Sequence, residues 1–189
     1  MNKERNVLVV ISGPSGVGKG TIAEILTKKN DNMALSISCT TRFPRNGETD
    51  GKEYFFIDRS VFEKEIADGG FLEYSEHFGN YYGTPKKFVM DKLKDFDVLL
   101  EIDVNGGLNV KKSFPDAILI MVIPPNLKEL EARLIGRHTE SDKEIELRMQ
   151  RIDYELEKKQ FYDYTVVNDN LDSAVKKIEE IINKEKTIK

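Results

Sequence analysis

A glycine-rich segment near the start of the chain carries the residue types that bind phosphate. It follows the apolar run Val7–Ile11 and consists of Ser12-Gly13-Pro14-Ser15-Gly16-Val17-Gly18-Lys19-Gly20-Thr21. Glycines let the backbone curl so that successive N–H groups point at one anion, and a helix beginning near Lys19 adds the positive end of its dipole. Lys19 can reach the outer phosphates as a mobile point charge. A strand, this loop and a helix together predict that residues 13–21 bind a nucleoside triphosphate.

Position 20 departs from the usual form of such a loop. The residue after the lysine is commonly Ser or Thr, whose hydroxyl contacts Mg²⁺. Here it is Gly20, and the hydroxyl of Thr21 comes one residue later, about 100° around the helix. We therefore expect the Mg²⁺ that accompanies the nucleotide to be held by phosphates and waters, with Asp103 as the candidate carboxylate for those waters. Asp103 could equally cap the helix that follows it, and the sequence leaves both roles open.

The arginines are unevenly distributed. Six of the eight fall in two groups, Arg42 with Arg45, and Arg133 with Arg137, Arg148 and Arg151. Arginine can grip phosphate with two parallel hydrogen bonds, whereas the scattered lysines are typical of a solvated surface. The groups indicate small phosphorylated ligands, although the second could also be one solvated helix face.

Composition narrows the class of protein. The chain has 189 residues and a net charge of −4, which suits one domain and argues against a general nucleic-acid binder. One cysteine excludes an internal disulfide, and the two histidines are too far apart to suggest a metal pair. We find neither a membrane span nor the features of a signal peptide, and we expect a cytoplasmic enzyme or binding domain.

Five short apolar runs alternate with helical patterns. They are Val7–Ile11, Leu35–Ser38, Val98–Ile102, Ile118–Ile123 and Tyr164–Val167. Runs of this kind are typical of strands buried on both faces, so the fold class we predict is α/β, with a P-loop-type parallel sheet flanked by helices. The apolar spacing of 174–182 predicts a closing helix, and we expect the chain to fray from Lys184 onward.

Two regions interrupt this alternation. Within the first we expect strands at 52–57 and 71–78, a helix capped by Ser60 with Glu63, and a helix that Thr84 caps and that runs to about Asp95. The second, 136–141, joins two helices, the later of which opens with a capping box at Ser141 and Glu144. We interpret the first region as an inserted lobe and the second as a flap.

The motifs of the first region resemble one family. They are Ser38-Cys39-Thr40-Thr41-Arg42-Phe43-Pro44-Arg45, Gly47-Glu48, Tyr54 and Gly79-Asn80-Tyr81-Tyr82-Gly83-Thr84. With the glycine loop, Glu101-Ile102-Asp103 and Val167-Asn168-Asp169, they occur in the order found in guanylate kinases. The chain is similar to that family over nearly its whole length.

The resemblance implies two substrate sites. ATP, with Mg²⁺, would occupy the glycine loop, and GMP, with dGMP as a second acceptor, would occupy the lobe. By similarity, the GMP phosphate would contact Arg42, Arg45, Tyr54 and Tyr82, and the base pocket would include Ser38, Glu73, Gly83, Thr84, Glu101 and Asp103. The implied layout is a core of residues 1–34, 97–132 and 162–189, a GMP-binding lobe of 35–96 and a helical lid of 133–161.

The resemblance also implies how transfer occurs. The family's flap arginines correspond to Arg133, Arg137 and Arg148, and they would close over the triphosphate. Together with Lys19 and Arg42 they would form the catalytic set. Direct transfer needs no general base, because the acceptor is already an anion. Asn168 would contact adenine by similarity, or could simply be a turn residue after a strand. The implied role lies in purine nucleotide metabolism, as a monomer or homo-oligomer without nucleic-acid or membrane partners.

The motifs also bear on two other classes of protein. Guanylate-kinase-like scaffold modules bind phosphorylated partners without catalysis, but they lose the loop lysine and glycines that this chain keeps at 13, 18 and 19. A nucleoside monophosphate kinase for AMP, UMP or dTMP would share the loop but not the motif of residues 40–45 or Glu73. Both alternatives are less favoured than an ATP:GMP phosphotransferase.

Overall fold

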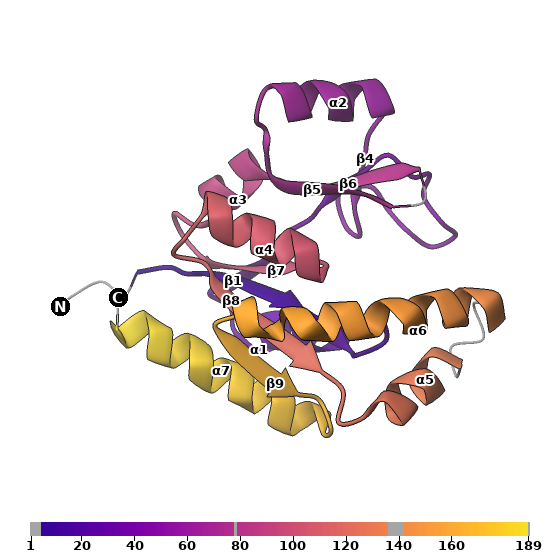
Figure 1. The fold of residues 1–189 in the computed structure, drawn as a ribbon. Coiled ribbons are helices and arrows are strands. Elements are labelled where there is room, and N and C mark those ends of the chain that lie inside the picture. The colour runs from indigo at the N-terminus through magenta and orange to yellow at the C-terminus, as the bar shows by residue number, and fades with distance from the viewer. Residues whose placement is uncertain (1–4, 78, 136–141, 189) are drawn as a thin grey trace.

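The computed structural model describes residues 5–77, 79–135 and 142–188, apart from the side chains at 133, 134, 142–148 and 188. The strands are β1 Leu8–Ser12, β2 Met33–Leu35, β3 Cys39–Thr40, β4 Phe55–Phe56, β5 Phe71–His77, β6 Asn80–Pro85, β7 Asp97–Glu101, β8 Ile118–Ile123 and β9 Tyr164–Val167. The α-helices are α1 Lys19–Lys29, α2 Arg59–Ala67, α3 Lys86–Lys92, α4 Val104–Ser113, α5 Leu127–Ile135, α6 Asp142–Glu157 and α7 Leu171–Ile188, and η1 Lys158–Phe161 is a 3-10 helix. Figure 1 shows the larger sheet enclosed by helices, with β5, β6 and α2 on one side of it.

The larger sheet confirms the predicted α/β class. Its order is β2-β7-β1-β8-β9, and every neighbouring pair is parallel. The five predicted strands are all present, but the second lies at Met33–Leu35 instead of Leu35–Ser38. The chain leaves the sheet after the Ser36 N–H donates to the carbonyl of Leu99, and the carbonyl of Ser38 already accepts from Phe55 in the second sheet.

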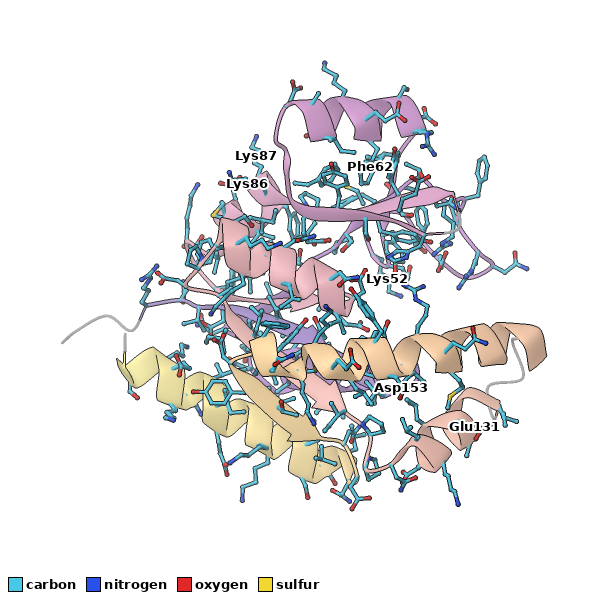
Figure 2. The ribbon with its side chains drawn as sticks, in the orientation of Figure 1. Lys52, Phe62, Lys86, Lys87, Glu131 and Asp153 are labelled. Carbon is cyan, nitrogen blue, oxygen red and sulfur yellow. The ribbon has the colours of Figure 1, made fainter. Side chains whose placement is uncertain are left out.

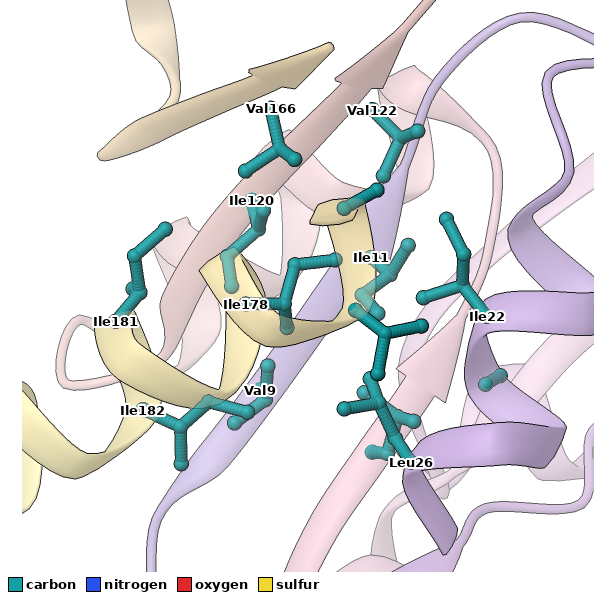
Figure 3. Close-up of a cluster of buried hydrophobic side chains, with 14 of the residues drawn as sticks. Val9, Ile11, Ile22, Leu26, Ile120, Val122, Val166, Ile178, Ile181 and Ile182 are labelled. Carbon is teal, nitrogen blue, oxygen red and sulfur yellow. The ribbon is translucent and has the colours of Figure 1, made fainter. Parts of the chain in front are cut away.

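The core lies on both faces of this sheet because alternate strand residues point to opposite sides. On one face Val9, Ile11, Ile120 and Val122 pack against buried residues of α1 and α7, as Figure 3 shows. On the other face Leu8, Val10, Leu119 and Met121 pack against α4, whose Val104 and Val110 are buried. The sheet is therefore a fixed platform for the loops at the carboxyl ends of its strands.

The smaller sheet has the order β4-β3-β6-β5 and corrects several predictions. We expected Thr84 to cap a helix, but Asn80–Pro85 forms β6, paired antiparallel with β5, and α3 begins only at Lys86. The predicted strand at 52–57 is reduced to Phe55–Phe56. Helix α2 begins one residue before Ser60, has no side-chain cap, and pairs Glu63 with Arg59 instead.

Helix α2 covers the smaller sheet through one aromatic residue. Phe62 is fully buried and stacks on Phe71 and Tyr81, with ring centroids 4.3 and 5.1 Å away. Figure 2 shows Phe62 between α2 and the strands. A Cβ at Gly83 would lie 2.9 Å from the Phe62 ring, so the small residue at position 83 lets the ring approach the sheet.

The C-terminal helix is longer than expected. Residues 174–182 lie in α7, as predicted, but the helix continues through 188 instead of fraying from Lys184. The Lys186 ammonium lies 2.8 Å from Oδ2 of the fully buried Asp97, which ties the end of α7 to β7. The predicted connector 136–141, with Ser141 of the proposed capping box, lies outside the described residues. In the described part of the chain, no helix has both the length and the apolar character to cross a membrane.

Candidate active site

The glycine loop lies between β1 and α1, as the sequence predicts. Gly13 and Gly18 have φ of +148° and +99°, where other residues are strained, and a Cβ at Gly13 would overlap the carbonyl oxygen of Val122. The Lys19 ammonium donates to the carbonyls of Gly13 and Pro14, at 2.8 and 3.1 Å. Helix α1 starts at Lys19, so its N-terminal N–H groups and the ammonium are at one place, and the arrangement can bind a polyphosphate.

Asn168 supports this loop from behind. Its side chain is buried, and its Nδ2 donates to the carbonyl of Val17 at 2.8 Å. A Cβ at Gly18 would lie 2.7 Å from the same nitrogen. The sequence left open an adenine contact or a turn role, and neither alternative includes this support of the loop.

A cluster around Arg42 forms a second cationic site, on the smaller sheet. The guanidinium makes two hydrogen bonds to the Glu48 carboxylate, at 2.7 and 2.9 Å, and stacks over Tyr54 at 5.3 Å from the ring centroid. Tyr82 packs edge-on against Tyr54. The hydrogen bonds to Glu48, and then to Tyr82, raise the pKa of Arg42. The contacts among Arg42, Tyr54 and Tyr82 bring together three of the four predicted phosphate ligands. The fourth, Arg45, is exposed nearby in sequence.

Glu48 orients this cluster, a role that the sequence motif did not predict. Arg42 first, and then the N–H of Arg45, lower the pKa of Glu48 to about 2, so the carboxylate stays ionised. Its oxygens hold the Arg42 fork and also accept from the Arg45 N–H at 2.7 Å. Glu48 thus fixes both the orientation of one arginine and the backbone of the other.

A buried carboxylate lies on the same sheet. Glu73 on β5 is paired with Thr84 on β6, and the Thr84 hydroxyl donates to its Oε1 at 2.6 Å. Burial raises the pKa of Glu73 to about 7, against the effect of Thr84, and the charge of Asp103 adds to the increase. Its Oε2 faces Gly106, where a Cβ would lie 2.9 Å away. Ser38, also predicted for this pocket, is half-buried.

Asp103 connects the two sheets. Its Oδ1 accepts from the Gly106 N–H at 2.8 Å, so it does cap α4. Its Oδ2 lies 3.0 Å from Nε2 of His77 and 3.4 Å from the Ser75 hydroxyl, both on β5. The sequence gave His77 no chemical role, because nothing local to it indicates a partner 26 residues away.

Helix α6 contributes a further carboxylate beside the loop. The pKa of Glu155 is raised, because the effect of burial exceeds the opposing effect of the nearby charges of Lys19 and Arg151. Arg151 itself is exposed, as expected for a surface charge. Of the predicted lid arginines, Arg137 lies outside the described residues, and Arg133 on α5 and Arg148 on α6 have side chains outside the described part.

Known proteins share this arrangement. The guanylate kinase family model matches residues 5–185. The chain belongs to the guanylate kinase family. The guanylate kinase of Listeria innocua serovar 6a is 50% identical over 184 residues, covering 96% of this chain and 90% of the relative. That of Caldanaerobacter subterraneus subsp. tengcongensis is 48% identical over 185 residues, covering 97% and 90%.

A solved guanylate kinase has the same fold. The crystal structure of guanylate kinase from Anaplasma phagocytophilum superposes with a TM-score of 0.80 and 31% identity, covering 98% of this chain and 89% of that one. The resemblance inferred from the motifs and the predicted fold class are both confirmed.

Proposed function

We propose that this protein transfers the γ-phosphoryl group of ATP directly to GMP, and to dGMP, giving ADP and the nucleoside diphosphate. The observation that carries the choice of acceptor is the buried Glu73 carboxylate, on the same sheet as Tyr82 of the Arg42 cluster. In this proposal residues 1–34, 97–132 and 162–189 form the ATP-binding core. Residues 35–96 form the GMP lobe, and 133–161 form the lid.

The Arg42 cluster binds the acceptor phosphate. A guanidinium matches two phosphate oxygens at once, and the Tyr54 and Tyr82 hydroxyls add donors without adding charge. Arg42 is already oriented by Glu48, so little freedom is lost when the phosphate binds. The exposed Arg45 completes the clamp.

Glu73 selects guanine. The base presents its N1–H and its 2-amino group side by side, and a carboxylate accepts from both. AMP has an acceptor at N1 and no amino group at position 2, so it would leave the buried carboxylate unpaired, which can cost a factor of about 10⁴. Ser38, Thr84 and Asp103 line the same pocket, and the Thr84 hydrogen bond fixes the orientation of Glu73. Gly83, which the resemblance also assigned to this pocket, instead faces Phe62 on the opposite side of the smaller sheet.

The transfer step depends on positioning and on charge stabilisation. Lys19 binds the transferring phosphate, and Arg133, Arg137 and Arg148 from the lid exclude water and stabilise charge on the equatorial oxygens. Asn168 supports the loop through the Val17 carbonyl, and the exposed Thr21 binds the triphosphate with the rest of the loop. No side chain needs to accept a proton, because the attacking phosphate oxygen is already ionised.

Mg²⁺ supplied with ATP would neutralise charge on the phosphates. The residues fit a metal that keeps its waters, because Gly20 offers no hydroxyl and the carboxylate of Glu101, the last residue of β7, lies close to position 20. Asp103 follows two residues later. Among the described residues, no group of three or more metal-ligating side chains is present. The phosphates themselves would therefore provide most of the direct ligands.

A coupled assay of ADP release tests the proposal. With ATP and Mg²⁺, we expect turnover with GMP and dGMP and at most about 10⁻³ of that kcat/KM with AMP, UMP or dTMP. Turnover with AMP comparable to that with GMP would reject the base pocket. The absence of turnover with every acceptor would reject the enzyme assignment.

A further inference from the structure

One face of β5 is directed at the beginning of α4. Alternate residues of a strand point to the same side, and Glu73, Ser75 and His77 are alternate residues of β5. Oε2 of Glu73 lies next to Gly106, where a Cβ would be 2.9 Å away. The Ser75 hydroxyl and Nε2 of His77 lie 3.4 and 3.0 Å from Oδ2 of Asp103. Three successive side chains of this face therefore reach one turn of the core, and the proposed function uses only the first of them.

The His77 contact holds Asp103 from the side of the lobe. An ionised carboxylate only accepts hydrogen bonds, so Nε2 of His77 carries a proton and donates, whether the ring is neutral or charged. The other oxygen, Oδ1, accepts at 2.8 Å from the N–H of Gly106, which belongs to the core. Asp103 is thus held by the core through one oxygen and by the lobe through the other. Because Gly106 also borders Glu73, the two carboxylates lie on either side of the same residue.

His77 also lies beside the residues that bind the acceptor phosphate. Its ring centroid is 6.0 Å from that of Tyr82, and Tyr82 packs edge-on against Tyr54. The side chains of His77 and Asp103 are 28% and 35% exposed, so their hydrogen bond is partly shielded from water. His77 therefore contacts one residue proposed for the base pocket and one proposed for the phosphate.

We propose that His77 is a positioning residue for GMP, which holds Asp103 against the lobe so that the base pocket is formed before the nucleotide binds. His77 acts through Oδ2 of Asp103 and not through a contact with the nucleotide. The benefit is preorganisation, because a carboxylate that is already oriented loses little freedom on binding. This inference rests on the proposed function, which places Asp103 in the base pocket and gives His77 no part.

The test measures GMP binding by calorimetry without ATP or metal, so it does not depend on turnover. The buffer is held at about pH 8, above the raised pKa of Glu73. We expect His77→Leu to raise the dissociation constant of GMP about tenfold, the size expected for loss of a hydrogen bond to a charged group. The affinity for ATP, measured separately in Mg²⁺, should stay within about twofold. His77→Gln keeps an N–H at similar reach and should bind GMP within about threefold of wild type.

A double-mutant cycle tests whether His77 acts through Asp103. Asp103→Ser keeps an oxygen that can cap α4 but removes the atom that faces His77. In that background His77→Leu should change the affinity for GMP by less than about twofold, because residues that act through one contact are not additive. A full tenfold effect in the Asp103→Ser background would overturn the inference, even if the single variant weakened binding.

The matched control is Glu76→Leu, the adjacent residue on the opposite face of β5, which should bind GMP as the wild type does. A GMP affinity of His77→Leu within about twofold of wild type would overturn the inference. So would equal losses of GMP and ATP affinity, because they would indicate a general loss of structure. Failure of the wild type itself to bind GMP would instead reject the proposed function, and the inference with it.

Discussion

The hydroxyl of Thr84 donates a 2.6 Å hydrogen bond to Oε1 of Glu73 across the β5–β6 pair. This contact holds a buried carboxylate in one orientation and leaves Oε2 directed toward Gly106, where the lobe meets α4. Two segments that the sequence predicts as a strand and a helix cap are thereby paired in one sheet. In the proposed function this pair forms one side of the base pocket and determines the selectivity for guanine.

Replacing Glu73 by Gln should reduce discrimination between GMP and AMP by at least about 100-fold in the ratio of kcat/KM. An amide has one acceptor where two donors need pairing, and a mispaired buried group costs about 1–3 kcal/mol, or more when charged. The affinity for ATP should stay within twofold. Glu76→Gln, on the same strand but half exposed, is the control and should preserve the ratio. An unchanged ratio in Glu73→Gln would exclude this residue from base recognition.

GMP binding should weaken as the pH falls through about 7. The raised pKa of Glu73 means that the ligand-free pocket takes up a proton near pH 7, and the protonated acid cannot accept both guanine donors. Below that pH the dissociation constant should rise by up to about tenfold per pH unit. The GMP phosphate titrates near pH 6 as well. The comparison is therefore made against Glu73→Gln by calorimetry from pH 5.5 to 8.5, and parallel profiles would contradict the prediction.

Arg42→Lys should raise the KM for GMP by at least about tenfold with little effect on the KM for ATP. Lysine lacks the planar guanidinium, which holds Glu48 with two of its N–H groups and has others left for a phosphate, so the substitution keeps the charge but loses the geometry. Arg59→Lys is the matched control, an exposed arginine on α2 that pairs with Glu63. Equal effects of the two substitutions would show that the lobe needs only positive charge.

Lys19→Ala should lower kcat by at least about 100-fold while GMP affinity stays within twofold. Two loop carbonyls hold the ammonium in the structure. In the proposed mechanism the ammonium binds the transferring phosphate, where loss of one such donor commonly costs this much. Lys28→Ala, exposed further along α1, should behave as wild type. Substantial turnover by purified Lys19→Ala would remove the lysine from the mechanism.

Lys186→Ala should destabilise the fold by about 3 kcal/mol, since it removes the cation that pairs with the fully buried Asp97 carboxylate. Among the described residues, the Asp97 carboxylate would keep the hydrogen bond from the Val7 N–H. Urea unfolding should show a lower midpoint with an unchanged slope. Lys184→Ala, two residues earlier in α7, should change stability by less than about 0.5 kcal/mol. Equal stabilities would show that α7 is held by its apolar face alone.

The sequence predicted the strands of the larger sheet because long apolar runs are buried there on both faces. The smaller sheet was harder, since β3 and β4 have two residues each and β6 contains Gly83 and Pro85, which usually signal a turn. Thr84 before a proline has the pattern of a helix cap, and only pairing with Glu73 across the sheet makes it a strand residue. Tertiary pairing decided these segments, and local pattern did not.

In the candidate site, too, local sequence pattern predicted some features and missed those that depend on tertiary contacts. Contiguous motifs were sufficient for the glycine loop and for Arg42, because each needs only residue types in a fixed order. Glu48 holding Arg42, His77 contacting Asp103 and Asn168 supporting Val17 were not predicted, since each relationship depends on where a distant or turning segment comes to lie. The extension of α7 to 188 escaped prediction for the same reason, because its anchor is on β7.

The central claim is that two anion-binding sites, one on each sheet, hold the two substrates end to end. Titration calorimetry with an adenosine and a guanosine joined through a 5′-polyphosphate tests it most directly. We expect one molecule of this linked ligand to bind per chain, at least about 100-fold more tightly than either ATP or GMP alone. Once one nucleoside is bound, the other reaches its own site at high effective concentration. Binding no tighter than that of ATP alone, or two molecules bound per chain, would contradict it.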